Sequence, residues 1–123
     1  MSVTTGLTIA EAAAMSGVSA HTLRYYERAG LIGVDRAASG HRRYSEDDLA
    51  WIHTLQCLRA TGMPIRDIRR YAELVRSGDQ NLEARLELLE QHRAAVLAQL
   101  DEVRGHLAFI DRKITTYKDR ING

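Results

Sequence analysis

The sequence predicts a mainly α-helical protein in which a small domain of short helices is followed by one long helix. Three observations predict this arrangement. Capping signals recur at short intervals over residues 1–78, and one proline and nine glycines leave few other breaks in the chain. Residues 79–123 instead repeat apolar side chains in steps of four and three. We therefore expect two domains, at residues 1–78 and 79–123.

The composition excludes some classes of protein. With 45% apolar and 27% charged residues, the chain of 123 residues has the composition of a folded soluble protein. No apolar run reaches the roughly 20 residues that cross a bilayer, so we expect no membrane partner. The first residues lack a basic segment followed by an apolar core, so we expect no secretory signal and a cytoplasmic location. The single cysteine, Cys57, excludes an internal disulfide and a cysteine-rich metal centre; we expect no metal and no cofactor.

The first two helices are predicted from their N-terminal caps. Thr8 and Glu11 have the spacing of a capping box, so a short helix should begin after Thr8. Ser19 should cap a second helix, with Gly30 in the position of a C-terminal glycine. The turn between them, at residues 16–18, contains a glycine, and this spacing is that of a helix-turn-helix.

Residues 31–44 have no helical period and are predicted to form a hairpin. Ser39 and Gly40 should make its turn, and a short basic strand should follow. A hairpin with a basic tip directly after a helix-turn-helix is a wing. The residues of this strand are His41, Arg42, Arg43 and Tyr44.

Two further helices complete the first domain. Ser45 is followed by three acidic residues, which suit the positive end of a helix dipole, so a third helix should begin there. It should end at Gly62. Pro64 should lie in the first turn of a fourth helix that ends near residues 77–78.

The long helix predicted for residues 81–121 carries a heptad pattern in which only Arg93 is not apolar. A helix of about 40 residues is about 60 Å long, and such a seam needs a partner helix. The economical partner is a second copy with two-fold symmetry; a helix folded back on its own domain is the alternative. The spacing leaves parallel and antiparallel pairing open. The seam residues expected in the dimer interface are Leu82, Leu86, Leu89, Val96, Leu100, Val103, Leu107, Ile110 and Ile114, and the pattern continues to Tyr117 and Ile121.

The second predicted helix has a polar face that suits a DNA groove. Arginine reads guanine edges, and tyrosine and threonine hold phosphates. Residues 1–78 contain ten arginines and no lysine. A solvated surface helix is the alternative, but the wing and the expected dimer favour DNA binding. The residues expected to contact DNA are Ser19, His21, Thr22, Arg24, Tyr25 and Arg28, together with the wing residues His41, Arg42, Arg43 and Tyr44.

These motifs resemble the MerR family of bacterial transcription regulators. The similarity is carried by LRYYERAGLI at residues 23–32, SGHRRYS at residues 39–45 and GMPI at residues 62–65. It implies a winged helix-turn-helix domain and an antiparallel coiled-coil dimer. By resemblance, Arg24 and Tyr25 match DNA-contacting positions of the recognition helix, and residues 42–44 match the wing. His41 departs from the tyrosine that is frequent at its position.

The same resemblance implies how the protein acts. The dimer should bind double-stranded promoter DNA between two recognition elements whose spacer is too long. It should then bend and untwist the DNA so that RNA polymerase reads both elements, which makes polymerase an indirect partner. We expect no effector-binding domain after residue 123.

Cys57 lies off the apolar side of the third predicted helix. At 100° per residue, the apolar residues of this helix centre about 165° away from Cys57. His53 lies one turn earlier on nearly the same side, and an imidazolium there would favour the reactive thiolate. The surrounding segment also resembles the single-cysteine branch of the family, which is associated with reactive aldehydes and nitrosative stress. Cys57 and His53 are therefore candidate sensing residues; a regulator whose cysteine merely packs as a small apolar side chain is the alternative.

Nothing in the sequence favours an enzyme. The chain has no HExxH zinc motif, no glycine-rich phosphate loop and no acidic calcium loop. The pair of Cys57 and His53 has no third group to orient it, so we expect no catalytic residues. A coiled-coil adaptor that uses its N-terminal domain for protein contacts is the alternative to a DNA-binding regulator.

Overall fold

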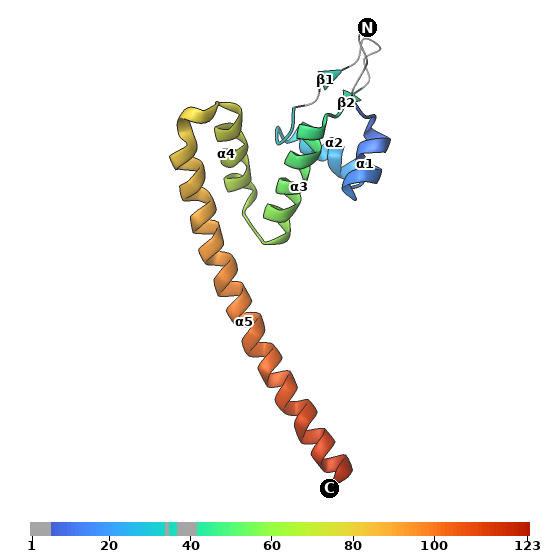
Figure 1. The fold of residues 1–123 in the computed structure, drawn as a ribbon, viewed down its shortest axis with the longest axis vertical. Coiled ribbons are helices and arrows are strands. Elements are labelled where there is room, and N and C mark those ends of the chain that lie inside the picture. Colours follow the sequence, from blue (N-terminus) through green and yellow to red (C-terminus); the bar gives the residue numbers. More distant parts are fainter. Residues whose placement is uncertain (1–5, 34, 37–41) are drawn as a thin grey trace. The chain divides into compact units, whose positions relative to one another are not determined.

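The structure, a computed structural model, describes residues 6–33, 35–36 and 42–123 (Figure 1). It consists of two compact units, residues 1–85 and residues 86–123, called here the first and the second unit. In chain order the elements are α1 (Ile9–Ser16), α2 (Ala20–Arg28), β1 (Asp35–Arg36), β2 (Arg42–Arg43), α3 (Glu46–Ala60), α4 (Ile65–Arg76), the 3-10 turn η1 (Asp79–Asn81) and α5 (Leu82–Asn122). The chain is mainly α-helical, as predicted.

Helices α1 and α2 form the predicted helix-turn-helix. The Thr8 hydroxyl accepts a hydrogen bond from the Glu11 backbone N–H at 3.1 Å, and the Glu11 carboxylate accepts one from the Thr8 N–H at 2.9 Å. The turn contains Gly17 at φ 74°, in the left-handed region that favours glycine. Ser19 then caps α2 by accepting from the Thr22 N–H at 3.1 Å. Reciprocal caps of this kind satisfy backbone donors that a helix end would leave unpaired.

The predicted hairpin follows α2. Strand β1 pairs antiparallel with β2, so that Asp35 lies opposite Arg43 and Arg36 opposite Arg42. Leu7 and Tyr44 exchange two backbone hydrogen bonds of 2.7 and 2.8 Å, which adds the segment before α1 to the ladder. The predicted turn residues and His41 lie outside the described residues.

Helices α3 and α4 complete the first unit. Ser45 and Asp48 form a second capping box, with hydrogen bonds of 2.8 and 3.1 Å. Pro64 does not lie in the first turn of α4 as predicted. Its ψ of 145° is extended, so it caps the helix, which begins at Ile65. The helix therefore begins one residue later than predicted.

The core of the first unit is built from all four short helices and the segments between them. Tyr26, Leu31 and Ile52 are among its largest fully buried side chains. The buried apolar set is Ala12, Val18, Leu23, Tyr26, Leu31, Ile32, Tyr44, Ile52, Leu55, Leu58, Met63, Ile68 and Ala72. By the usual magnitude of about 25 cal/mol per Å² of apolar surface, this burial is the main stabilising term of the unit.

The first turn of α5 belongs to the first unit because Arg85 holds the end of α4. Its guanidinium donates to the Leu74 carbonyl at 3.3 Å, to the Val75 carbonyl at 3.4 Å and to the Gly78 carbonyl. The first two are carbonyls in the last turn of α4, where a helix lacks internal donors and its dipole favours a cation, and Gly78 lies just after that helix. The compact unit therefore extends past residue 78 to Arg85.

The rest of α5 is the second unit. The long helix is confirmed, and it spans 41 residues with no buried side chain. The apolar seam stays exposed: Leu100 is 41% and Leu107 54% accessible. No helix among the described residues is both long and apolar enough to cross a membrane.

Candidate DNA-binding surface

Helix α2 separates an apolar inner face from a polar outer face. Leu23 and Tyr26 are 0% and 2% exposed and pack in the core. His21, Arg24 and Arg28 lie on the exposed side, with Tyr25 beside them. The polar face predicted for this helix is confirmed, and α2 presents a guanidinium-rich face that no other described element buries.

The N-terminal end of α2 adds hydrogen-bond donors to this surface. The hydroxyls of Ser19 and Thr22 lie 3.0 Å apart at the helix end. Backbone N–H groups at such an end attract phosphate, because the helix dipole is positive there. The two predicted contacts therefore lie where a phosphate of the DNA backbone would be stabilised.

Arg59 of α3 belongs to the same surface, and the sequence reasoning missed it. Its guanidinium donates to the Tyr26 hydroxyl at 3.3 Å and lies 5.6 Å from the centre of the Tyr26 ring. The exposed Arg59 also lines a shallow hollow of about 370 Å³ together with Ser19 and Thr22. Its distance of 33 residues from Tyr26 in the chain left no local signal that could have found it.

The wing is attached to the core by Tyr44, and this corrects one prediction. Tyr44 is 0% exposed, so its side chain is not available to DNA and its expected contact is wrong. The physical reason is its pairing with Leu7, which continues the ladder at the base of the hairpin where side chains turn into the core. Arg42 and Arg43 lie in β2 directly before it.

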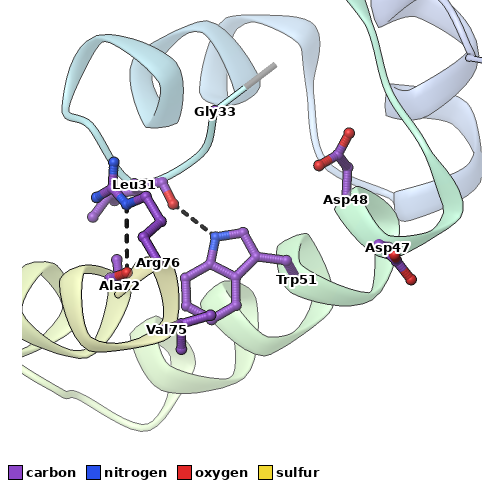
Figure 2. A pocket seen from close by; sticks show the side chains of 8 residues that line it. All are labelled: Leu31, Gly33, Asp47, Asp48, Trp51, Ala72, Val75 and Arg76. Carbon is purple, nitrogen blue, oxygen red and sulfur yellow. Dashed lines mark hydrogen bonds between the residues drawn. The ribbon is translucent and has the colours of Figure 1, made fainter. Parts of the chain in front are cut away.

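Side chains of α3 and α4 hold the segment directly after α2, and this set of contacts is called here the joint behind α2 (Figure 2). The Trp51 indole N–H donates to the Leu31 carbonyl at 2.7 Å, and Arg76 donates to the Gly30 carbonyl at 2.6 Å. The Trp51 ring stacks on Tyr71 with ring centres 5.8 Å apart. Two carbonyls after α2 are thus held by α3 and α4, which sets the direction in which the chain enters the wing. The joint encloses a pocket of about 310 Å³ lined by Leu31, Gly33, Asp47, Asp48, Trp51, Ala72, Val75 and Arg76.

Cys57 lies on the exposed side of α3, as the helical geometry predicts. Its carbonyl accepts a hydrogen bond from the Thr61 hydroxyl at 2.7 Å, while its thiol is accessible. His53 is also exposed. Across the part of the chain that the structure describes, no three His, Cys, Asp or Glu side chains are grouped so as to hold a metal ion.

These features define a class of protein: a winged helix-turn-helix regulator with a long C-terminal helix. Residues 7–74 match the profile of the MerR HTH family regulatory proteins. An uncharacterized HTH-type transcriptional regulator of Haemophilus influenzae is 41% identical over 112 residues, which cover 90% of this chain and 83% of that protein. The HTH-type transcriptional regulator AdhR of Bacillus subtilis is 41% identical over 92 residues, 74% of this chain and 66% of AdhR.

A solved structure agrees with the sequence comparison. The crystal structure of HiNmlR, described as a MerR family regulator lacking the sensor domain and bound to promoter DNA, superposes with a TM-score of 0.84. The two are 40% identical, and the match covers 93% of this chain and 91% of HiNmlR. The chain belongs to the MerR family of transcriptional regulators.

Proposed function

We propose that this protein is a transcription regulator that binds a pseudo-palindromic promoter site as a homodimer and distorts the DNA. The observation that carries the proposal is the exposed arginine, histidine and tyrosine face of α2, with the wing attached directly after it. The similarity to HiNmlR, whose crystal structure contains promoter DNA, supports the same conclusion.

The proposed DNA contacts have different tasks. Arg24 reads a guanine edge in the major groove, because its guanidinium can form two parallel hydrogen bonds with one base. The cap of α2, the wing arginines and Arg59 hold phosphates and set the position of the helix. The proposed contact set is Ser19, His21, Thr22, Arg24, Tyr25, Arg28, His41, Arg42, Arg43 and Arg59.

The proposed dimer forms through residues 79–123, and residues 1–78 form the DNA-binding domain. The exposed seam of α5 supports this division, since apolar side chains in such a continuous pattern require a partner. Two-fold symmetry then gives two half-sites. RNA polymerase is affected indirectly, through the distorted promoter.

A footprint of the purified protein on its promoter tests this proposal. We expect two protected half-sites related by two-fold symmetry and an affinity that falls steeply with salt, because phosphate contacts release counterions. A protein-interaction adaptor would give no protection at any salt concentration, and that result would refute the proposal.

The proposal also covers location and chemistry. A promoter-binding regulator works in the cytoplasm, and it needs neither a catalytic residue nor a cofactor. The absence of hydrolytic and phosphate-binding motifs from the sequence supports this part of the proposal.

Cys57 is proposed as the point at which a signal enters. The thiol of an exposed cysteine adds to an aldehyde carbonyl to give a hemithioacetal, which keeps all atoms of both reactants. The adduct would change the populations of two dimer geometries, and so the DNA distortion more than the affinity. The exposure of Cys57, and of His53 one turn before it, supports this role.

Substitution of the thiol tests the sensing role. Cys57→Ser should bind the operator normally and stop responding to aldehyde or nitrosothiol in a transcription assay. His53→Ala should slow modification and leave it complete at long times, because the thiol is still present. An unaltered response in Cys57→Ser would mean that the protein is a MerR regulator without thiol sensing.

A further inference from the structure

The seam of α5 contains one charged residue, Arg93, among apolar side chains. The seam residues within the second unit are Leu86, Leu89, Arg93, Val96, Leu100, Val103, Leu107, Ile110, Ile114 and Tyr117. A guanidinium that enters an apolar interface loses hydration, and it is tolerated only where a carboxylate or an exit to water compensates the loss. The position of Arg93 in the dimer therefore restricts how two copies of α5 can pair.

Parallel pairing brings two charges together. A symmetric parallel pair has its two helices in register, so that every seam residue faces its own copy. Arg93 would then face Arg93 of the partner subunit in the middle of an apolar seam. Like charges at such short range repel, and the repulsion is strongest where water is excluded. Arg93 therefore opposes the parallel arrangement.

Antiparallel pairing removes this conflict and leaves three registers one heptad apart. In an antiparallel pair the two helices run in opposite directions. The seam residue after Arg93 is Val96, three positions further on, and it must face the partner's preceding seam residue. The residue that faces Arg93 must therefore lie three positions after another seam residue. Within the second unit these residues are Leu89, Val96, Val103, Ile110 and Tyr117 of the partner subunit. Pairing with Leu89 or Val96 would leave the seam from Ile110 onward without a partner, so the three registers that remain have Arg93 facing Val103, Ile110 or Tyr117. In each register, one residue of the partner subunit faces Arg93. The next residue in the partner's chain lies on the same side of the interface as Arg93.

The charge of that neighbouring residue distinguishes the three registers. Next to Val103 is Arg104, and next to Tyr117 is Lys118; both repel Arg93. Next to Ile110 is Asp111, which attracts it. Glu90 lies three positions before Arg93 in its own helix and therefore on the same side. In this register Arg93 lies between two carboxylates, and all other seam residues from 86 to 117 face apolar residues of the partner.

We propose that the antiparallel pair of α5 helices, which the family resemblance already implies, adopts the register in which Arg93 packs against Ile110 and beside Asp111 of the partner subunit. Arg93 thereby determines the register of the coiled coil. The same register aligns Leu86 with Tyr117, Leu89 with Ile114, Val96 with Leu107 and Leu100 with Val103. This inference rests on the proposed homodimer and specifies its interface.

Crosslinking between single-cysteine variants tests the register in the full-length protein. All variants carry Cys57→Ser, so that the introduced cysteine is the only thiol, and one member of each mixture carries a tag that changes its size. After subunit exchange, Val96→Cys mixed with Leu107→Cys should form a heterodimer band with a short bismaleimide. Val96→Cys mixed with Leu100→Cys or with Ile114→Cys reports the two other registers and should crosslink much more slowly. Val96→Cys alone reports parallel pairing and should give no band.

The outcomes separate this inference from the proposed function. A dominant band from Val96→Cys alone, or from either alternative mixture, overturns the register while the dimer stands. A wild-type chain that sediments as a monomer overturns both.

Charge variants test the role of Arg93 itself. Asp111→Arg should raise the dimer dissociation constant on the order of tenfold or more, since two symmetric attractions become repulsions. Arg93→Asp combined with Asp111→Arg should restore dimerisation, and Asp101→Arg on the outer face of the helix is the matched control. Arg93→Leu should stay dimeric while crosslinking of Val96→Cys to itself appears. Unchanged crosslinking in Arg93→Leu, or no rescue by the double variant, contradicts the role of Arg93.

Discussion

The two units use the same apolar residue types with opposite results. In the first unit, Ile52 and Leu55 are fully buried, because short helices pack against one another around a shared centre. In the second unit, Val103 and Leu107 are 61% and 54% exposed, because a single helix offers them no neighbour. A heptad pattern therefore identifies the apolar side of a helix but not the element that covers it. The apolar residues of the first unit stabilise the fold of one chain, and those of the second are available to the proposed dimer.

The largest expected effect breaks the assembly and leaves the fold. Leu100→Glu places a charge in the middle of the seam, where both copies lose apolar burial and must desolvate a carboxylate. We expect a monomer in sedimentation velocity and loss of operator binding, with an unchanged core of the first unit. Ala98→Glu, which adds the same charge on the outer side of the helix, is the control. A dimeric Leu100→Glu protein would contradict the assignment of the seam.

The second prediction breaks the fold of the first unit. Leu55→Ala removes a fully buried side chain and leaves a cavity, which costs about 2–5 kcal/mol of unfolding free energy. Denaturant unfolding followed by circular dichroism measures the loss. The control is Met15→Ala, because Met15 is 68% exposed in the same unit and its truncation should change little. Equal effects of the two substitutions would show that burial is not what distinguishes these positions.

The third prediction concerns residues that matter only when DNA is present. Arg24→Ala should leave thermal stability unchanged, weaken operator binding by roughly 1–3 kcal/mol and relax the preference at one base in each half-site. Arg43→Ala should weaken all sequences alike and reduce the salt slope by about one unit. Binding to operator variants at two salt concentrations checks both. If Arg24→Ala weakens every sequence equally, Arg24 contacts the backbone and not a base.

The smallest expected effect lies at the joint behind α2. Trp51→Phe keeps an aromatic ring against Tyr71 and removes the hydrogen bond to the Leu31 carbonyl. We expect a loss of about 0.5–1.5 kcal/mol in unfolding free energy, the usual net contribution of one hydrogen bond. Urea unfolding of the variant and the wild type measures the difference, and a variant as stable as the wild type would show that the bond contributes nothing.

Local signals predicted most element boundaries. The capping boxes at Thr8 and Ser45 predicted where α1 and α3 begin, because each cap is a contact between residues three positions apart. The glycines after the first two helices predicted where these helices stop. The prediction for Pro64 was wrong by one residue. Proline is compatible with both the cap and the first turn of a helix, and only the observed ψ distinguishes the two positions.

Contacts between distant residues could not be predicted in this way. Tyr44 directly follows the two wing arginines, yet it pairs with Leu7 and its side chain is buried in the core. Arg59 reaches Tyr26, and Arg76 reaches the Gly30 carbonyl 46 residues away. None of these pairs has a characteristic spacing, so no pattern in the sequence indicates them.

The helices, their caps, the polar face of α2 and the heptad seam of α5 could all be predicted from the sequence, because each depends on interactions within a few residues or on a fixed helical period. The burial of Tyr44 in the core and the position of Arg59 beside the N-terminal end of α2 depend on the tertiary structure. So does the extension of the first unit to Arg85, since that guanidinium binds carbonyls of α4 and of the turn after it. The physical reason is that burial and the partners of polar groups depend on which segments the fold brings together, and that information lies in no single stretch of the chain.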